Sequence, residues 1–177
     1  MNELQLIRGQ LRTERERVCE VAAASAGNAA TLPFRQACVD YLVFALARFE
    51  ERDQILAERL HSRLTPPDPR RPQLDQALLL AGTSREALTR LEAALALSSQ
   101  GSPAHETRGW SEFAAFVSGP WCGRRDAIDA VQEQAALVSD WRAASLVDAD
   151  SILQERSLYA RVQPGISGGL VGGSAPR

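Results

Sequence analysis

The sequence contains no lysine, so arginine supplies all 20 of its basic residues, and histidine occurs only twice in 177 residues. Such exclusive use of arginine, together with abundant alanine, is typical of a bacterial genome rich in G and C. The 22 acidic residues leave a net charge of −2. That near-neutral balance lacks the electrostatic footprint of a surface that binds DNA or RNA.

Long apolar runs are also missing. None approaches the ~18–20 residues that a helix needs to cross a bilayer. The first residues, MNELQLIRG, are charged from Glu3 onward and are unlike a signal peptide. We therefore expect a cytoplasmic protein that binds neither a membrane nor nucleic acid.

Cysteine is scarce, and its positions do not suggest a framework. The three residues Cys19, Cys38 and Cys122 are an odd number, are widely spaced and form no C-x-x-C pair. Free thiols are commonly buried as small apolar groups, and disulfides are rare in the cytoplasm. We predict three buried free thiols in preference to a disulfide or a zinc site.

Hydrophobic residues make up 45 % of the chain, enough for the core of one domain. They recur at three- and four-residue spacing, which indicates helices, and period-two alternation is absent. The prolines of 65–72 exclude a helix there, and Gly119-Pro120 predicts a kink. The predicted helices cover residues 2–26, 33–64, 73–99, 110–139 and, as a short last helix, 147–162. The sequence thus predicts an all-α domain over 1–163, an antiparallel four-helix bundle with an additional C-terminal helix.

Residues 164–177 carry five glycines and no periodicity, which predicts a flexible tail. Three apolar residues, Ile166, Leu170 and Val171, are set among these glycines. The texture resembles the cargo-loading tails that dock small iron proteins inside encapsulin shells, where an extended peptide places apolar side chains in pockets. The resemblance implies a protein partner for the tail; the alternative is a plain disordered end.

Charged residues interrupt the apolar stripes near the middle of the helices. Glu14 and Asp53 occupy stripe positions in the first two helices, Arg124 does so in the fourth, and Ser84 and Arg85 do so in the third. Because a buried charge without a partner costs several kcal/mol, these groups should meet. We interpret them as a core ion-pair network. The alternatives are solvated positions at a helix seam and a metal site on the carboxylates.

Three segments resemble hemerythrin-like domains: LRTERERV (11–18), the acidic and aromatic stretch 37–60, and WSEFAAFVSGPW (110–121). That family holds two irons in a four-helix bundle with about five histidines and two carboxylates. This chain has Arg15 and Arg48 where the first two helices of the family would supply histidines. The resemblance therefore implies a divergent member that has lost its di-iron centre, with a cation such as Arg124 neutralising the carboxylates.

A weaker metal hypothesis comes from Glu58 and His61, whose Glu-x-x-His spacing matches one of the two motifs of ferritin-like di-iron proteins. With Glu14 and Asp53 they would form a carboxylate-rich iron site. His61 also suits the end of a helix, where the dipole favours a cation, and His105 is expected in a loop.

No catalytic motif is complete, since both G-x-S-x-G and a phosphate-binding glycine loop are missing. The leading hypothesis is a non-enzymatic binding or regulatory module that has no cofactor. The alternative is an iron- or oxygen-binding protein, carried as encapsulin cargo. An anti-sigma-type regulator, suggested by VDYL at 39–42, ranks third. The sequence does not determine the oligomeric state. We expect Trp110, Trp121 and Trp141 to pack under the C-terminal helix, and the alternative is a dimer face.

Overall fold

The computed structural model describes residues 3–25, 31–98, 103–144 and 149–169, and within these ranges it is helical with no strand. The all-α prediction is therefore confirmed. The elements in chain order are α1 (Glu3–Ser25), α2 (Leu32–Arg63), α3 (Arg71–Ser98), α4 (Pro103–Phe116), the π-helix η1 (Val117–Trp121), α5 (Cys122–Ala135), α6 (Val138–Ala144) and α7 (Ala149–Gly169).

The ends of α2 follow from local chemistry. Thr31 caps its N-terminus by accepting a hydrogen bond from the Phe34 N–H at 3.4 Å, and Pro33 fits the first turn, where its missing N–H is not needed. At the other end Leu64 adopts an extended conformation. The turn that follows is held by Asp68, whose Oδ1 accepts from the Arg70 N–H at 2.9 Å.

The predicted fourth helix is several elements. Helix α4 begins at Pro103, before the predicted start at residue 110, so His105 lies in a helix and the loop expected there is wrong. Pro120 lies within the π-helix, which adds a residue to one turn. The chain then becomes extended at Ala136, and α6 starts with a capping arrangement in which the Asp140 carboxylate accepts from the Leu137 N–H at 2.8 Å.

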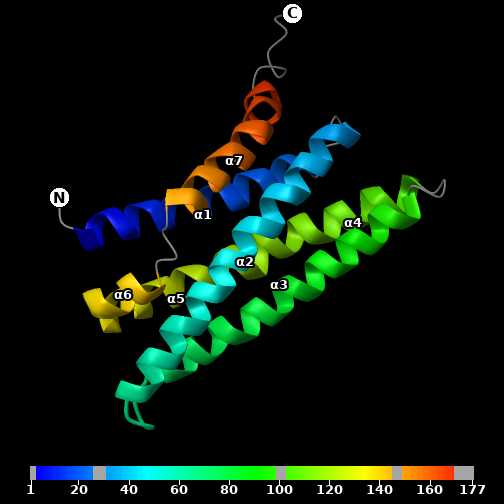
Figure 1. Ribbon diagram of the computed structural model, residues 1–177. Helices are drawn as coiled ribbons and strands as arrows, with labels where there is room; N and C mark the ends of the chain where they lie inside the picture. The colour runs from blue at the N-terminus through cyan, green and yellow to red at the C-terminus, as the bar shows by residue number, and fades with distance from the viewer. Residues whose placement is uncertain (1–2, 26–30, 99–102, 145–148, 170–177) are drawn as a thin grey trace, which may run out of the picture.

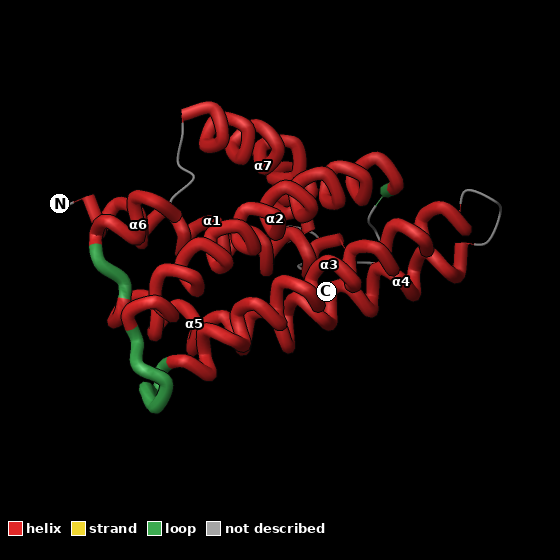
Figure 2. The backbone as a smooth tube through the Cα atoms, turned by 60° about the horizontal axis from the view of Figure 1, so that its bottom comes forward, coloured by secondary structure: helices red, strands yellow, loops and turns green. Residues whose placement is uncertain are grey.

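Helix α2 lies at the centre of the molecule and packs against α1, α3, α6 and α7 (Figure 1). Helix α3 packs along α4 and α5, and α7 lies over α1 and α2, as Figure 2 shows from another side. Within the described residues no helix combines the length and apolarity needed to cross a membrane.

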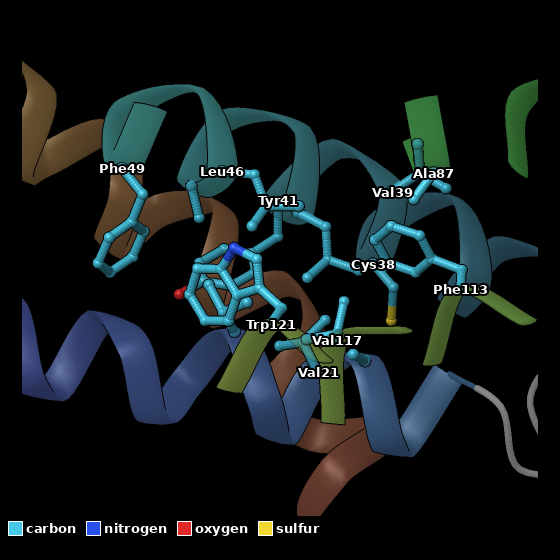
Figure 3. Packing of buried hydrophobic residues seen from close by; sticks show 14 of the residues in the cluster. Val21, Cys38, Val39, Tyr41, Leu46, Phe49, Ala87, Phe113, Val117 and Trp121 are labelled. Atoms are coloured by element: carbon cyan, nitrogen blue, oxygen red, sulfur yellow. The ribbon is translucent and has the colours of Figure 1, made fainter. Parts of the chain in front are cut away.

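The main apolar core lies where α1, α2, α3 and the α4–η1 segment meet (Figure 3). Trp121 and Phe49 pack edge to face, with ring centroids 5.3 Å apart. Trp110 and Trp141 are also buried. All three tryptophans thus lie inside the chain, and the dimer-face alternative does not describe them.

Helix α7 continues to Gly169, so residues 164–169 are helical and the flexible tail predicted from 164 is wrong for them. Ile166 packs against the main core and is not a free anchor for a partner. Gly165 lies so close to Phe34 that a Cβ there would overlap its ring. Leu170 and Val171 lie outside the described residues.

Candidate functional site

The centre of the site is Asp53 on α2, which is only 2 % exposed. Arg125 of α5 binds it with two guanidinium nitrogens: Nη1 donates to Oδ2, and Nη2 donates to Oδ1 at 2.7 Å. Gln132 Nε2 donates to Oδ1 at 3.0 Å, and Arg52 Nη2 donates to the same oxygen at 3.2 Å. A bidentate arginine pair of this kind is among the strongest ionic contacts in proteins.

A second carboxylate, Asp129, joins these groups one turn after Arg125. It accepts from Arg125 Nε at 2.8 Å, from Arg15 Nη1 at 3.2 Å and from Arg52 Nη2 at 3.5 Å. The guanidiniums of Arg52 and Arg125 lie over the Phe49 ring, 4.5 and 5.1 Å from its centroid. We call the group the Asp53 network; its members are Asp53, Asp129, Arg15, Arg52, Arg125 and Gln132.

Arg125, and not the predicted Arg124, is the inward arginine of α5. Arg124 is exposed, whereas Arg125 is only 1 % exposed. The π-helix explains the error: its wider turn adds a residue, so the buried positions step from Val117 to Trp121 and on to Arg125. Counting at ordinary helical spacing across Pro120 therefore arrives one residue early.

Arg85 is also misplaced by the sequence prediction. It is exposed and pairs with Glu50 on α2, its Nε donating to Oε2 at 3.2 Å. Of the two polar positions predicted on this helix, Ser84 is the buried one, and its Oγ donates to the Leu80 carbonyl at 2.8 Å. Neither residue contacts the Asp53 network.

Burial is the main influence on the titration of the two aspartates. It raises the pKa of Asp53 from 3.8 to about 6, against the lowering effect of Arg52 and Gln132. Burial also raises the pKa of Asp129, where Arg52 and Arg15 oppose it. At neutral pH Asp53 is therefore ionised and bound to arginine.

Glu14 is buried as predicted but belongs to a different cluster. Its Oε1 accepts from Gln10 Nε2 at 2.9 Å and from Arg48 Nη2 at 3.3 Å. Arg48 also donates to the Ser151 carbonyl of α7 at 3.0 Å. Glu14 and Asp53 thus each have their own arginine, and no contact joins them directly.

A buried carboxylate that the prediction missed is Glu155 on α7, which is 0 % exposed. Arg17 Nη1 donates to both of its oxygens, at 3.0 and 2.8 Å, and the Tyr41 hydroxyl donates to Oε1 at 3.1 Å. The signal was present: Glu155 stands at stripe spacing between Ile152 and Tyr159.

The alternative metal ligands are not brought together. Glu58 is exposed and accepts from Gln54 Nε2 at 3.2 Å. His61 lies in the last turn of α2, as predicted, with its Nε2 3.0 Å from the Asp75 carboxylate on α3. It forms no hydrogen bond or ion pair with the Asp53 network. Across the described part of the chain, no group of three or more His, Cys, Asp or Glu residues is arranged to hold a metal ion.

Two of the three cysteines are paired, so the prediction of free thiols is wrong for them. Cys19 of α1 forms a disulfide with Cys122 at the start of α5. Cys38 is a free, buried thiol, and burial raises its pKa to about 12. Sequence spacing gave no sign of the pair because its members are 103 residues apart.

A cavity of about 270 Å³ lies between α1 and α5. Arginines of α1 form one wall, and Asp126, Asp129 and Glu133 of α5 face them; Trp141 of α6 also lines the space. Arg15 crosses between the two walls, donating to Asp126 Oδ1 at 2.6 Å. The cavity therefore adjoins the Asp53 network through Asp129.

No family model, curated protein or solved structure matches this chain. The chemistry of the site has to be inferred from its own geometry. Its carboxylates are bound by guanidiniums, which arginine keeps charged at every working pH. Such a core holds helices in register, and its groups have little freedom to transfer protons.

Proposed function

We propose that the protein is a non-enzymatic binding or regulatory module, built on an antiparallel four-helix bundle whose usual metal has been replaced by arginine. In this proposal α1, α2, α3 and the α4–α5 segment are the four members of the bundle, and α7 is an added helix. One observation carries it. The four carboxylates that are buried among the described residues, Glu14, Asp53, Asp140 and Glu155, are each bound by an arginine.

The resemblance to hemerythrin-like domains suggests why arginine binds these carboxylates. Arg15 and Arg48 stand where that family would supply histidine ligands. Both form ion pairs with carboxylates: Arg15 with Asp129 at 3.2 Å and Arg48 with Glu14 at 3.3 Å. A carboxylate core needs positive charge, which either a metal ion or a guanidinium can provide. Arginine in the ligand positions supports a core neutralised without metal.

A catalytic role is less well supported. The raised pKa of Asp53 is a feature that some catalytic carboxyls share. A general base, however, must reach the proton of a substrate. Both oxygens of Asp53 already accept hydrogen bonds from Arg125, and Oδ1 accepts two more from Arg52 and Gln132. Structural ion-pair networks also perturb pKa values, so a raised pKa by itself does not identify a catalytic carboxyl.

Metal analysis of the full chain tests the proposal. Protein purified from cells grown with added iron should contain far less than one iron per chain and show no ligand-to-metal charge-transfer band in the near ultraviolet. Its melting temperature should not change when a strong chelator is added, because no metal links folding to binding. Two irons per chain would contradict the proposal and favour the carboxylate-rich iron site.

A further inference from the structure

The cavity between α1 and α5 has the size and the lining of a small-molecule site. Its volume of about 270 Å³ lies just below the ~300–1,000 Å³ of pockets for drug-sized ligands. Leu11 and Ala130 supply apolar wall, and four arginines, Arg8, Arg12, Arg15 and Arg52, supply charge. A small molecule with one charged end and an apolar body matches this combination.

A second arginine of α1 lies beside Arg12 at this cavity. Arg8 precedes Arg12 by one helical turn, so the two side chains share one face of α1. Arg8 is held in place by its Nη2, which donates to the Glu133 backbone carbonyl at 2.6 Å. Its guanidinium therefore lies at the cavity wall without a carboxylate partner among the described residues.

On the α1 side of the cavity, the charge that no ion pair neutralises is positive. Arg12 forms no hydrogen bond or ion pair with any described residue, although it lies near enough to lower the pKa of Asp129. Asp129 already accepts from three guanidiniums, and Asp126 is paired with Arg15. Glu133 is therefore the carboxylate whose charge still opposes an anion here.

We propose that this cavity binds a small molecule that carries a carboxylate or phosphate group on an apolar body. The guanidiniums of Arg8 and Arg12 bind the oxyanion, and the apolar body lies on Leu11 and Ala130. Arginine suits both oxyanions because its planar fork matches their geometry. The inference rests on the proposed function, since it names the ligand class of a module that acts by binding.

Calorimetric titration of the full chain at constant ionic strength tests the site, with benzoate, phenyl phosphate and inorganic phosphate as probes and chloride as the salt control. At least one aromatic probe should bind at one site per chain, and more tightly than inorganic phosphate. Arg12→Gln should weaken that binding by roughly 10- to 100-fold, because hydrogen bonds to charged groups contribute about 1.5–3 kcal/mol. Arg108→Gln, an exposed arginine paired with Glu112 on α4, is the matched control and should bind like the wild type.

Two further variants separate the role of each wall. Arg8→Gln removes the second guanidinium of the α1 wall, so it should weaken binding. Glu133→Gln removes the opposing charge, so it should tighten binding several-fold. Failure of both aromatic probes to bind the wild type would overturn the inference, as would equal affinity in Arg12→Gln. Weaker binding in Glu133→Gln would overturn it too, because the site would then select a cationic group.

Metal content measured on the same sample keeps the two proposals apart. Iron-free protein that binds neither aromatic probe would contradict the anion site and leave the metal-free module standing. Protein with two irons per chain that binds a probe through Arg12 would contradict the proposed function and leave the anion site standing. Arg12 is exposed and unpaired, so its replacement leaves the fold intact, which circular dichroism can verify.

Discussion

At the scale of single residues, the neighbours Arg124 and Arg125 have opposite surroundings, and they offer a matched test of the Asp53 network. Replacing Arg125 with Met leaves the buried Asp53 without its bidentate partner, and breaking such a pair costs about 3–5 kcal/mol. Arg124→Met changes an exposed position and should alter the free energy of unfolding by less than about 0.5 kcal/mol. Urea unfolding at pH 7.5 measures both, and equal effects would contradict the assignment of Arg125.

Asp53 gives a second prediction, because its pKa is raised by burial from 3.8 to about 6. Between these values the folded protein holds a proton on Asp53 that the unfolded chain has released. The stability that this proton provides is complete below 3.8 and is lost as pH rises through 6. We expect the free energy of unfolding of the wild type, relative to Asp53→Asn, to fall by up to about 1.4 kcal/mol per pH unit over that window.

Denaturant unfolding of both proteins from pH 4 to pH 7 checks this slope. The Asn variant removes the titration of Asp53 and keeps every other titrating group, so the difference between the two curves isolates the one carboxyl. A difference that grows in favour of the wild type with rising pH would show that Arg125 lowers the pKa of Asp53 more than burial raises it.

At the scale of the elements, the docking of α7 depends on a residue without a side chain. A Cβ on Gly165 would overlap the Phe34 ring, whereas a Cβ on Gly9 in α1 meets no atom within 4 Å. Gly165→Ala should therefore destabilise the protein by about 1–3 kcal/mol through overpacking. Gly9→Ala should stabilise it by about 0.5–1 kcal/mol, the ordinary gain in a helix interior. Thermal unfolding distinguishes the two signs, and stabilisation by both would mean that the end of α7 is not docked on Phe34.

The accuracy of the sequence predictions also differs between elements. The bounds predicted for the first two helices differ from α1 and α2 by no more than one residue at each end, because their apolar residues recur at regular helical spacing and Pro33 suits a first turn. The π-helix left no periodic signal, and it moved the inward arginine by one position. Glu155 stands at stripe spacing in α7, but the sequence prediction considered interrupting charges only in the first four helices. The cavity depends on how α1 and α5 face each other, which spacing within one helix cannot reveal.

At the scale of the whole molecule, the Cys19–Cys122 disulfide closes a loop of more than half the chain. A cross-link over about 100 residues contributes up to about 4.7 kcal/mol in the chain-entropy model, and removal of a native disulfide commonly costs 2–5 kcal/mol. Cys122→Ser should therefore lower the free energy of unfolding by a similar amount. Cys38→Ala is the control, since it removes a thiol that takes no part in the pair.

Thiol counting checks the pairing itself. Protein unfolded without reductant should show one reactive thiol per chain, that of Cys38, and three after reduction. The folded protein should react slowly even at pH 8, because burial raises the pKa of Cys38 to about 12. Three thiols before reduction would mean that the pair is open in the purified protein. Since disulfides persist mainly in oxidising compartments, the same count also bears on the cytoplasmic prediction.

A crystal structure of protein from iron-supplied cells, with anomalous data collected at the iron edge, tests most directly whether arginine has taken the place of metal. We expect no anomalous peak within the bundle, and we expect both Arg125 guanidinium nitrogens within hydrogen-bond distance of Asp53. An iron peak bound by Asp53, Asp129 or Glu14, with Arg125 turned away, would contradict the metal-free core.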